Sequence, residues 1–354
     1  KSYGWELQSQ WETIDTLGSV RIEEKIGPSN SKVFKVKHKK LPESMVLVDS
    51  QYKPPQIAGK QSAESGNAFL LSVNHPFITP LRGVYHGKRT QLLLNYCSHG
   101  ELKAYLIKLK ESKLPEDLAL FYTAEIASAL GELHSYGIVY RGFQENLESI
   151  FLDHGYHIQL TDVGIHPASI AFLAPEILSL NKGQTFASDW WALGVLLYEM
   201  VTGKKPYYSN DKNLMKSMIC CEDKILDTED ISSPHLKELI KSLLQRNPAE
   251  RLREFNKIRE HAAFEEAGLK CRGDWDMLIQ KKLPLPPSVR CLKEFDSSGN
   301  RSQVEVDETH CSFVRVPYHD TPNLGFMDFL PSSSLSSSCS KSNSLRSIPE
   351  YAEK

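Results

Sequence analysis

Long apolar runs are missing from this chain of 354 residues, and neither sign of charge is in excess. No stretch of 18 apolar residues occurs, so the sequence offers no candidate for a membrane-spanning helix. Lys and Arg number 42 against 44 Asp and Glu, and the net charge of -2 provides no overall positive field for a nucleic-acid backbone. We therefore expect protein partners, with no nucleic acid and no membrane span.

Cysteines with metal-site or redox spacing are also missing. The seven cysteines form no C-x-x-C pair and their number is odd, which is typical of reduced thiols. No set of His and Cys has the spacing of zinc ligands. The first residues lack the apolar core of a signal peptide. Together these absences predict a cytoplasmic location.

Two regions of different periodicity are present. Short apolar or alternating runs at 32–37, 45–48 and 91–96 predict strands, and 63–73 fits a helix. Beyond Pro115, apolar residues recur every three or four positions, which predicts one helix there and another after Ser233-Pro234. The segment from Asp189 to Met200 is apolar on nearly every side, so we expect a helix enclosed by others. The pattern predicts an α+β fold with a small β-rich lobe and a large helical lobe.

Five short motifs follow one another in an order that resembles the landmarks of protein kinases. They are His75-Pro76-Phe77-Ile78, Tyr140-Arg141-Gly142, the run from Ile158 to Gly164, Ala174-Pro175-Glu176, and the run from Asp189 to Gly194. The pair Trp190-Trp191, together with Arg251, Trp275 and the proline-rich 284–287, is similar to the AGC group of kinases, which includes protein kinase A and the ribosomal-protein S6 kinases.

The resemblance implies a bilobal protein-kinase-like fold and a division of the chain. Residues 1–19 would be an N-terminal extension, 20–97 the N-lobe, 98–290 the C-lobe and 291–331 an AGC-type C-terminal tail. Residues 332–354 are rich in serine and poor in large apolar residues, so we expect a disordered end.

The resemblance also implies ATP and Mg²⁺ in the cleft, and the phosphate-binding loop of this chain is reduced. The loop keeps Gly27 alone among its glycines, Pro28 removes a backbone donor, and Ser29 and Lys32 complete the candidate contacts. A polar hairpin between two strands is the alternative interpretation of this segment.

The paired charges that hold the phosphates are missing as well. Val46 occupies the position of the family's strand lysine, and Gly66 that of the helix glutamate that pairs with it. Asn95 and Cys97 would line the nucleotide site from the segment between the lobes. We therefore expect ATP and Mg²⁺ to bind weakly, or no cofactor to bind.

The catalytic loop departs further from the family. Gly142 stands where the resemblance implies the aspartate that accepts the substrate's proton, and Gln144 stands at the adjacent lysine. The metal-binding asparagine falls on Ser149 or Asn146, depending on the alignment. Asp162, in Asp162-Val163-Gly164, resembles the aspartate that holds Mg²⁺, although an ordinary Asp-x-Gly turn reads the same way.

Positions that maintain the fold are retained. Glu176 and Arg251 resemble the family's buried ion pair, and Asp189 resembles the residue that caps the central helix and holds the catalytic loop. In the tail, Phe326 and Phe329 resemble the hydrophobic motif that docks on the N-lobe, with a loose partner-binding motif as the alternative.

These residues predict a catalytically impaired Ser/Thr protein kinase homologue, a pseudokinase, that acts as a scaffold or allosteric partner in kinase signalling, with an active kinase as a candidate partner. One alternative is a slow, unconventional Ser/Thr kinase that takes its lysine from Lys32 and a base from Glu145 or Glu148. The other is a nucleotide sensor that binds ATP without hydrolysis.

Overall fold

The structure is a computed structural model, and it describes a defined part of the chain. The described residues are 20–26, 33–38, 43–50, 73–86, 90–109, 112–143, 150–161, 169–180, 183, 185–221, 223 and 225–297. All of them belong to the compact unit Lys1–Arg315. In these ranges no helix combines the length and the apolar character that crossing a membrane requires.

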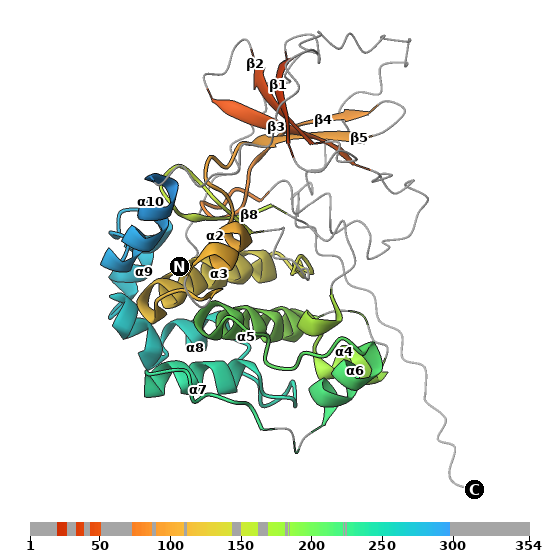
Figure 1. Cartoon of the computed structure of the whole chain (residues 1–354), viewed down its shortest axis with the longest axis vertical. Helices are drawn as coiled ribbons and strands as arrows, with labels where there is room; N and C mark the ends of the chain where they lie inside the picture. Colours follow the sequence, from red (N-terminus) through yellow and green to blue (C-terminus); the bar gives the residue numbers. More distant parts are fainter. Residues whose placement is uncertain are drawn as a thin grey trace, which may run out of the picture. The chain divides into compact units, whose positions relative to one another are not determined.

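The N-terminal part is an antiparallel sheet of five strands (Figure 1). Its strands are β1 (Val20–Ile26), β2 (Val33–His38), β3 (Ser44–Ser50), β4 (Leu81–His86) and β5 (Thr90–Asn95), in the spatial order β1-β2-β3-β5-β4. Val36, Met45, Leu47 and Leu93 are buried together on one face of it. The predicted β-rich lobe is confirmed, and the runs at 32–37, 45–48 and 91–96 fall on β2, β3 and β5.

The C-terminal part is helical, with a small sheet of β6 (Gly100–Glu101), β7 (Ile150–Leu152) and β8 (Ile158–Leu160). Its helices and short 3-10 turns are α2 (Leu102–Lys108), α3 (Glu116–Ser135), η4 (Ile170–Phe172), α4 (Pro175–Leu180), α5 (Phe186–Thr202), α6 (Lys212–Cys220), α7 (Pro234–Leu243), α8 (Phe255–Arg259), η5 (Ala262–Ala267), α9 (Arg272–Ile279), η6 (Pro287–Val289) and α10 (Arg290–Ser297). The predicted bilobal kinase-like architecture is confirmed.

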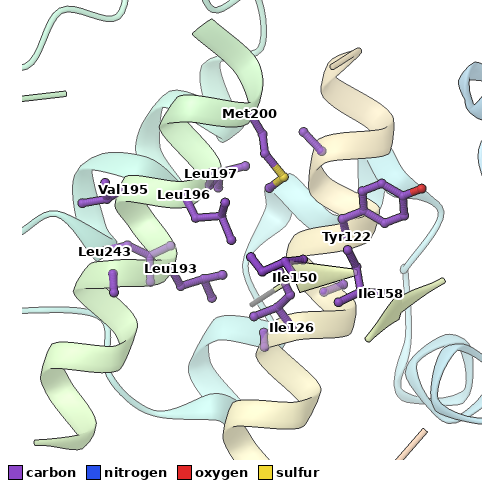
Figure 2. Close-up of a cluster of buried hydrophobic side chains, with 14 of the residues drawn as sticks. Tyr122, Ile126, Ile150, Ile158, Leu193, Val195, Leu196, Leu197, Met200 and Leu243 are labelled. Atoms are coloured by element: carbon purple, nitrogen blue, oxygen red, sulfur yellow. The ribbon is translucent and has the colours of Figure 1, made fainter. Parts of the chain in front are cut away.

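The core of the helical part lies where α3 and α5 pack side by side (Figure 1). Figure 2 draws this core, in which Leu193, Leu196 and Met200 of α5 lie with Tyr122 and Ile126 of α3. All five side chains are 0% exposed, so their apolar surface is fully removed from water. Burial of apolar surface is the main stabilising term in folding. The apolar character that predicted an enclosed helix is explained by this burial.

Helix α5 begins three residues earlier than the apolar run suggests. Thr185 is its N-cap, and the side chains and backbones of Thr185 and Ser188 form a capping box. Asp189 therefore does not cap the helix, which corrects the sequence interpretation, and it lies in the first turn. On the far side of α5, a Cβ added to Gly194 would lie 2.8 Å from the Cβ of Leu243, so only glycine allows α7 to pack this closely.

Some other helix boundaries differ from those predicted from the sequence. Pro115 is the N-cap of α3 rather than a first-turn residue, and α7 begins at Pro234 as predicted. The helix expected at 63–73 lies outside the described residues apart from Val73, which is buried and in no helix. The sequence reasoning missed α10, a short helix with Leu292 buried, that directly follows the proline-rich run.

Candidate functional site

Asp189 clamps the backbone of the candidate catalytic loop. Its Oδ2 accepts a hydrogen bond from the Tyr140 N–H at 2.8 Å, and its Oδ1 accepts one from the Arg141 N–H at 3.2 Å. His134 Nε2 lies 2.8 Å from the same Oδ2. Because the Asp189 side chain is only 3% exposed, these charge-assisted contacts are poorly screened by water and hold the loop firmly.

The clamp stabilises an unusual backbone conformation. Arg141 has a φ of 58°, in the left-handed region that a side chain with a Cβ seldom adopts. Around it, Tyr140 and Phe143 are buried and their rings meet edge to face, with Phe143 also stacked on Phe172. The loop therefore has a defined conformation, held by contacts on both sides of Gly142.

Gly142 itself is buried and has no side chain to accept a proton. It follows the clamped residues Tyr140 and Arg141 at the position where the resemblance implies an aspartate. Gln144 and the alternatives Asn146 and Ser149 lie outside the described residues. The backbone before position 142 is thus held by Asp189, and residue 142 itself offers no side-chain proton acceptor.

Val46 lies in the middle of the five-stranded sheet. In the β2–β3 register it stands directly opposite Lys35, and in the β3–β5 register directly opposite Leu94. Its side chain is half-buried and apolar, so it cannot bind a phosphate. Gly66, the expected partner position, lies outside the described residues.

Asn95 and Cys97 flank the link between β5 and the helical part, but their side chains serve other contacts. Asn95 Oδ1 accepts a hydrogen bond from Arg82 Nε at 2.7 Å. Cys97 is 7% exposed, and burial raises the pKa of its thiol to about 12, so this cysteine is protonated and unreactive at neutral pH. The Asn95 Oδ1 and the Cys97 thiol are therefore engaged within the protein rather than presented to a ligand.

Glu176 and Arg251 lie in hydrogen-bond contact beside the N-terminal end of α5. Arg251 Nη1 and Nη2 donate to Glu176 Oε1 and Oε2 at 2.8 and 2.9 Å, the bidentate geometry that suits a guanidinium and a carboxylate. Arg251 also donates to the carbonyl oxygens of Ala187, Gln245 and Arg246. Its side chain is 0% exposed, so this ion pair ties α4, α5 and the segment after α7 into one unit.

A second buried contact between titratable side chains was missed by the sequence reasoning. Glu125, inside α3, contacts His157 Nδ1 through Oε1 and accepts the Ile158 N–H through Oε2 at 2.8 Å. Glu125 is fully buried, and burial raises the pKa of its carboxyl group while His157 opposes the rise. An acid at a core position of an apolar helix is the signal that could have revealed it, because such a charge requires a partner.

The remaining candidate residues lie outside the part of the chain that the structure describes. They are Gly27, Ser29 and Lys32 of the phosphate loop, Asp162, and the tail residues Phe326 and Phe329. Within the described ranges, no group of three or more His, Cys, Asp or Glu side chains is arranged to hold a metal ion.

Comparison with known proteins agrees with the fold. The protein kinase domain model matches residues 20–264. A RAC family serine/threonine-protein kinase homolog of Dictyostelium discoideum is 34% identical over 251 residues, which are 67% of this chain and 53% of that protein. Serine/threonine-protein kinase sgk-1 of Caenorhabditis elegans is 29% identical over 326 residues, 85% of this chain and 68% of the relative.

A third relative has a much longer chain. Human ribosomal protein S6 kinase alpha-3 is 34% identical over 235 residues, 61% of this chain but only 30% of that protein. The chain thus spans between about a third and two thirds of the length of these relatives. On the strength of the matched domain and of these relatives, the chain belongs to the protein kinase family and, within it, to the AGC group of Ser/Thr kinases.

Proposed function

We propose that this AGC-type kinase fold is catalytically impaired and acts as a scaffold or allosteric partner in kinase signalling. The observation that carries the proposal is the contrast at the catalytic loop. Asp189 accepts hydrogen bonds from the Tyr140 and Arg141 N–H groups at 2.8 and 3.2 Å, and the next residue is Gly142. A loop kept in shape without a proton acceptor suits a protein whose fold matters more than its turnover.

Magnitudes support impairment. A general base contributes a factor of about 10² to 10⁴ to the rate of the reaction it assists. Val46 stands where the resemblance implies a lysine, so the sheet also lacks that cation. The two losses of rate do not simply multiply, because catalytic groups act as a unit. Protein kinases turn over at about 1 to 100 per second, so efficient transfer is out of reach for this site.

The nucleotide and metal of the family fit the described residues poorly. Kinases of this family use ATP and Mg²⁺. Val46 and Gly142 offer neither a phosphate contact nor a metal ligand at the family's positions, and hard Mg²⁺ prefers several oxygen ligands. The candidates Gly27, Ser29, Lys32 and Asp162 are outside the described residues. We propose weak ATP binding and derive no catalytic step from it.

The partner role is the finer part of the proposal. We propose an active AGC kinase as the partner, engaged through the tail aromatics Phe326 and Phe329. The test is recovery of an identified kinase with the full chain, and its loss when both aromatics are changed to alanine. A chain that stays monomeric and recovers no kinase, with the wild-type tail intact, contradicts this role. The cytoplasm is the proposed location, because the described cysteines are free thiols.

A specific observation favours a nucleotide sensor as the second candidate. Glu24, Lys35, Val46 and Leu94 stand directly opposite one another on successive strands, so their side chains share one face of the sheet. Lys35 is half-buried, and its Nζ lies 4.8 Å from the centroid of the Tyr96 ring. Lys35 on β2 therefore places a cation next to Val46, the β3 position that carries no charge.

We expect millimolar ATP to stabilise the full chain by about 1 kcal/mol, which corresponds to a ligand concentration a few times its Kd. Lys35→Met should weaken the ATP affinity about tenfold, because it removes the ammonium group from this face. Lys25→Met is the matched control, since Lys25 is exposed and stands opposite Phe34 on the other face of the strand pair. Equal ATP-induced melting shifts in wild type and Lys35→Met would eliminate the sensor that uses this lysine.

A further inference from the structure

Asp296, near the end of α10, accepts hydrogen bonds from side chains that belong to distant parts of the chain. Its carboxylate oxygens lie 3.0 Å from the hydroxyl of Tyr105 on α2, and Oδ2 lies 2.6 Å from the hydroxyl of Tyr156, in the turn between β7 and β8. His99 Nδ1 lies 2.9 Å from the same Oδ2. Asp296 thereby joins α10 to the connector, defined here as residues 96–100, which leads from β5 to α2.

Aromatic contacts surround this carboxylate. The ring of His99 stacks on that of Tyr156, with centroids 3.9 Å apart, and Tyr105 meets Phe295 of α10 edge to face at 5.5 Å. Lys293 lies 5.7 Å from the Tyr156 ring centroid. The side chains of His99 and Asp296 are 16% and 14% exposed, so water screens their contact less than it screens contacts at the surface.

Helix α10 is weak by itself. It has eight residues, and isolated helices of that length are not stable in water. Leu292 is its one fully buried side chain among the described residues, and Phe295 is half-buried. The helix must therefore obtain its stability from docking, and the Asp296 carboxylate is the polar part of that docking.

We propose that α10 is a releasable clasp on the connector and that Asp296 is the positioning residue that holds it closed. Closure fixes His99, and through it the segment that follows Cys97, against the turn at Tyr156. Loss of the Asp296 charge frees both α10 and the connector, while the core around α3 and α5 stays folded. The clasp goes beyond the proposed function and does not depend on nucleotide binding, because every group in it lies on α2, α10, the connector or the β7–β8 turn.

Hydrogen exchange of the full chain tests the clasp. The His99 and Gly100 amides donate to the carbonyl oxygens of Leu152 and Cys97, so their exchange reports opening of the connector. We expect Asp296→Asn to raise exchange in the connector and α10 about tenfold, with α3 and α5 unchanged. Glu294→Gln is the matched control, since it removes the same charge from an exposed position of the same helix, and its exchange should stay within about twofold of wild type.

A second variant keeps the inference testable if Asp296→Asn folds poorly. Tyr156→Phe keeps the ring that stacks on His99 and removes only the hydroxyl, so it should raise connector exchange by less than Asp296→Asn does. Unchanged connector exchange in both variants would overturn the clasp. A uniform rise that includes α3 and α5 would overturn it too, because Asp296 would then support global stability alone.

Discussion

Arg251→Met is expected to lower the free energy of unfolding by about 3 to 5 kcal/mol, because removing one partner of a buried ion pair strands the other. Methionine is similar in length and apolar, so the main loss is electrostatic rather than a cavity. Glu176 would lose its bidentate partner, and the carbonyl oxygens of Ala187 and Gln245 would lose a donor. Chemical denaturation of the full chain measures the change.

Arg253→Met is the matched control for this prediction. Arg253 lies two residues further along and is exposed, so its replacement should change stability by no more than about 0.5 kcal/mol. If the two variants unfold at the same denaturant concentration, the Glu176–Arg251 pair does not stabilise the fold. The presence of the pair would then give no support to the view that this chain functions through its fold.

Stability is expected to fall as the pH is lowered from 7 to 5, in part because of His75. Burial, and secondarily the charge of Lys281, lower the pKa of His75 from 6.5 to about 3 in the folded chain. The unfolded chain therefore binds a proton below pH 6.5 that the folded chain refuses, and this group costs about 2 kcal/mol of stability at pH 5. Its contribution is fully favourable above pH 6.5 and is lost as the pH falls toward 3.

His75→Asn isolates this contribution. Asparagine offers a side-chain oxygen to the Phe77 N–H, which donates to His75 Nδ1 at 3.3 Å in the wild type, and it does not titrate. The variant should thus lose about 2 kcal/mol less than wild type between pH 7 and pH 5, in denaturation curves measured at both values. Curves that fall in parallel would mean that His75 takes up a proton without cost in the folded chain.

The core helices could be predicted because the spacing of their apolar residues indicates directly which faces are buried. The apolar positions of α3 recur with helical spacing, and α5 is apolar all around because helices enclose it. The same logic failed for Asp189. An acid just before an apolar run resembles a cap, yet this carboxylate faces the backbone of Tyr140, 49 residues away in sequence, and Thr185 is the cap.

Contacts between distant segments could not be predicted in this way. The position of Lys35 opposite Val46 follows from strand register, which depends on pairing and not on the composition of either strand. The groups around Asp296 come from positions 99, 105 and 156, and no spacing rule connects them. Glu125 is the exception, since a buried acid within an apolar helix face already demands a partner such as His157.

Transfer of labelled phosphate from ATP to a general protein substrate tests the central claim most directly. The purified full chain would be compared with its own Asp162→Ala variant and with an active AGC kinase, at saturating ATP and Mg²⁺. We predict that wild type and Asp162→Ala are indistinguishable and that turnover is below about 0.01 per second, against about 1 to 100 per second for active kinases. Turnover near 1 per second that disappears in Asp162→Ala would contradict the account.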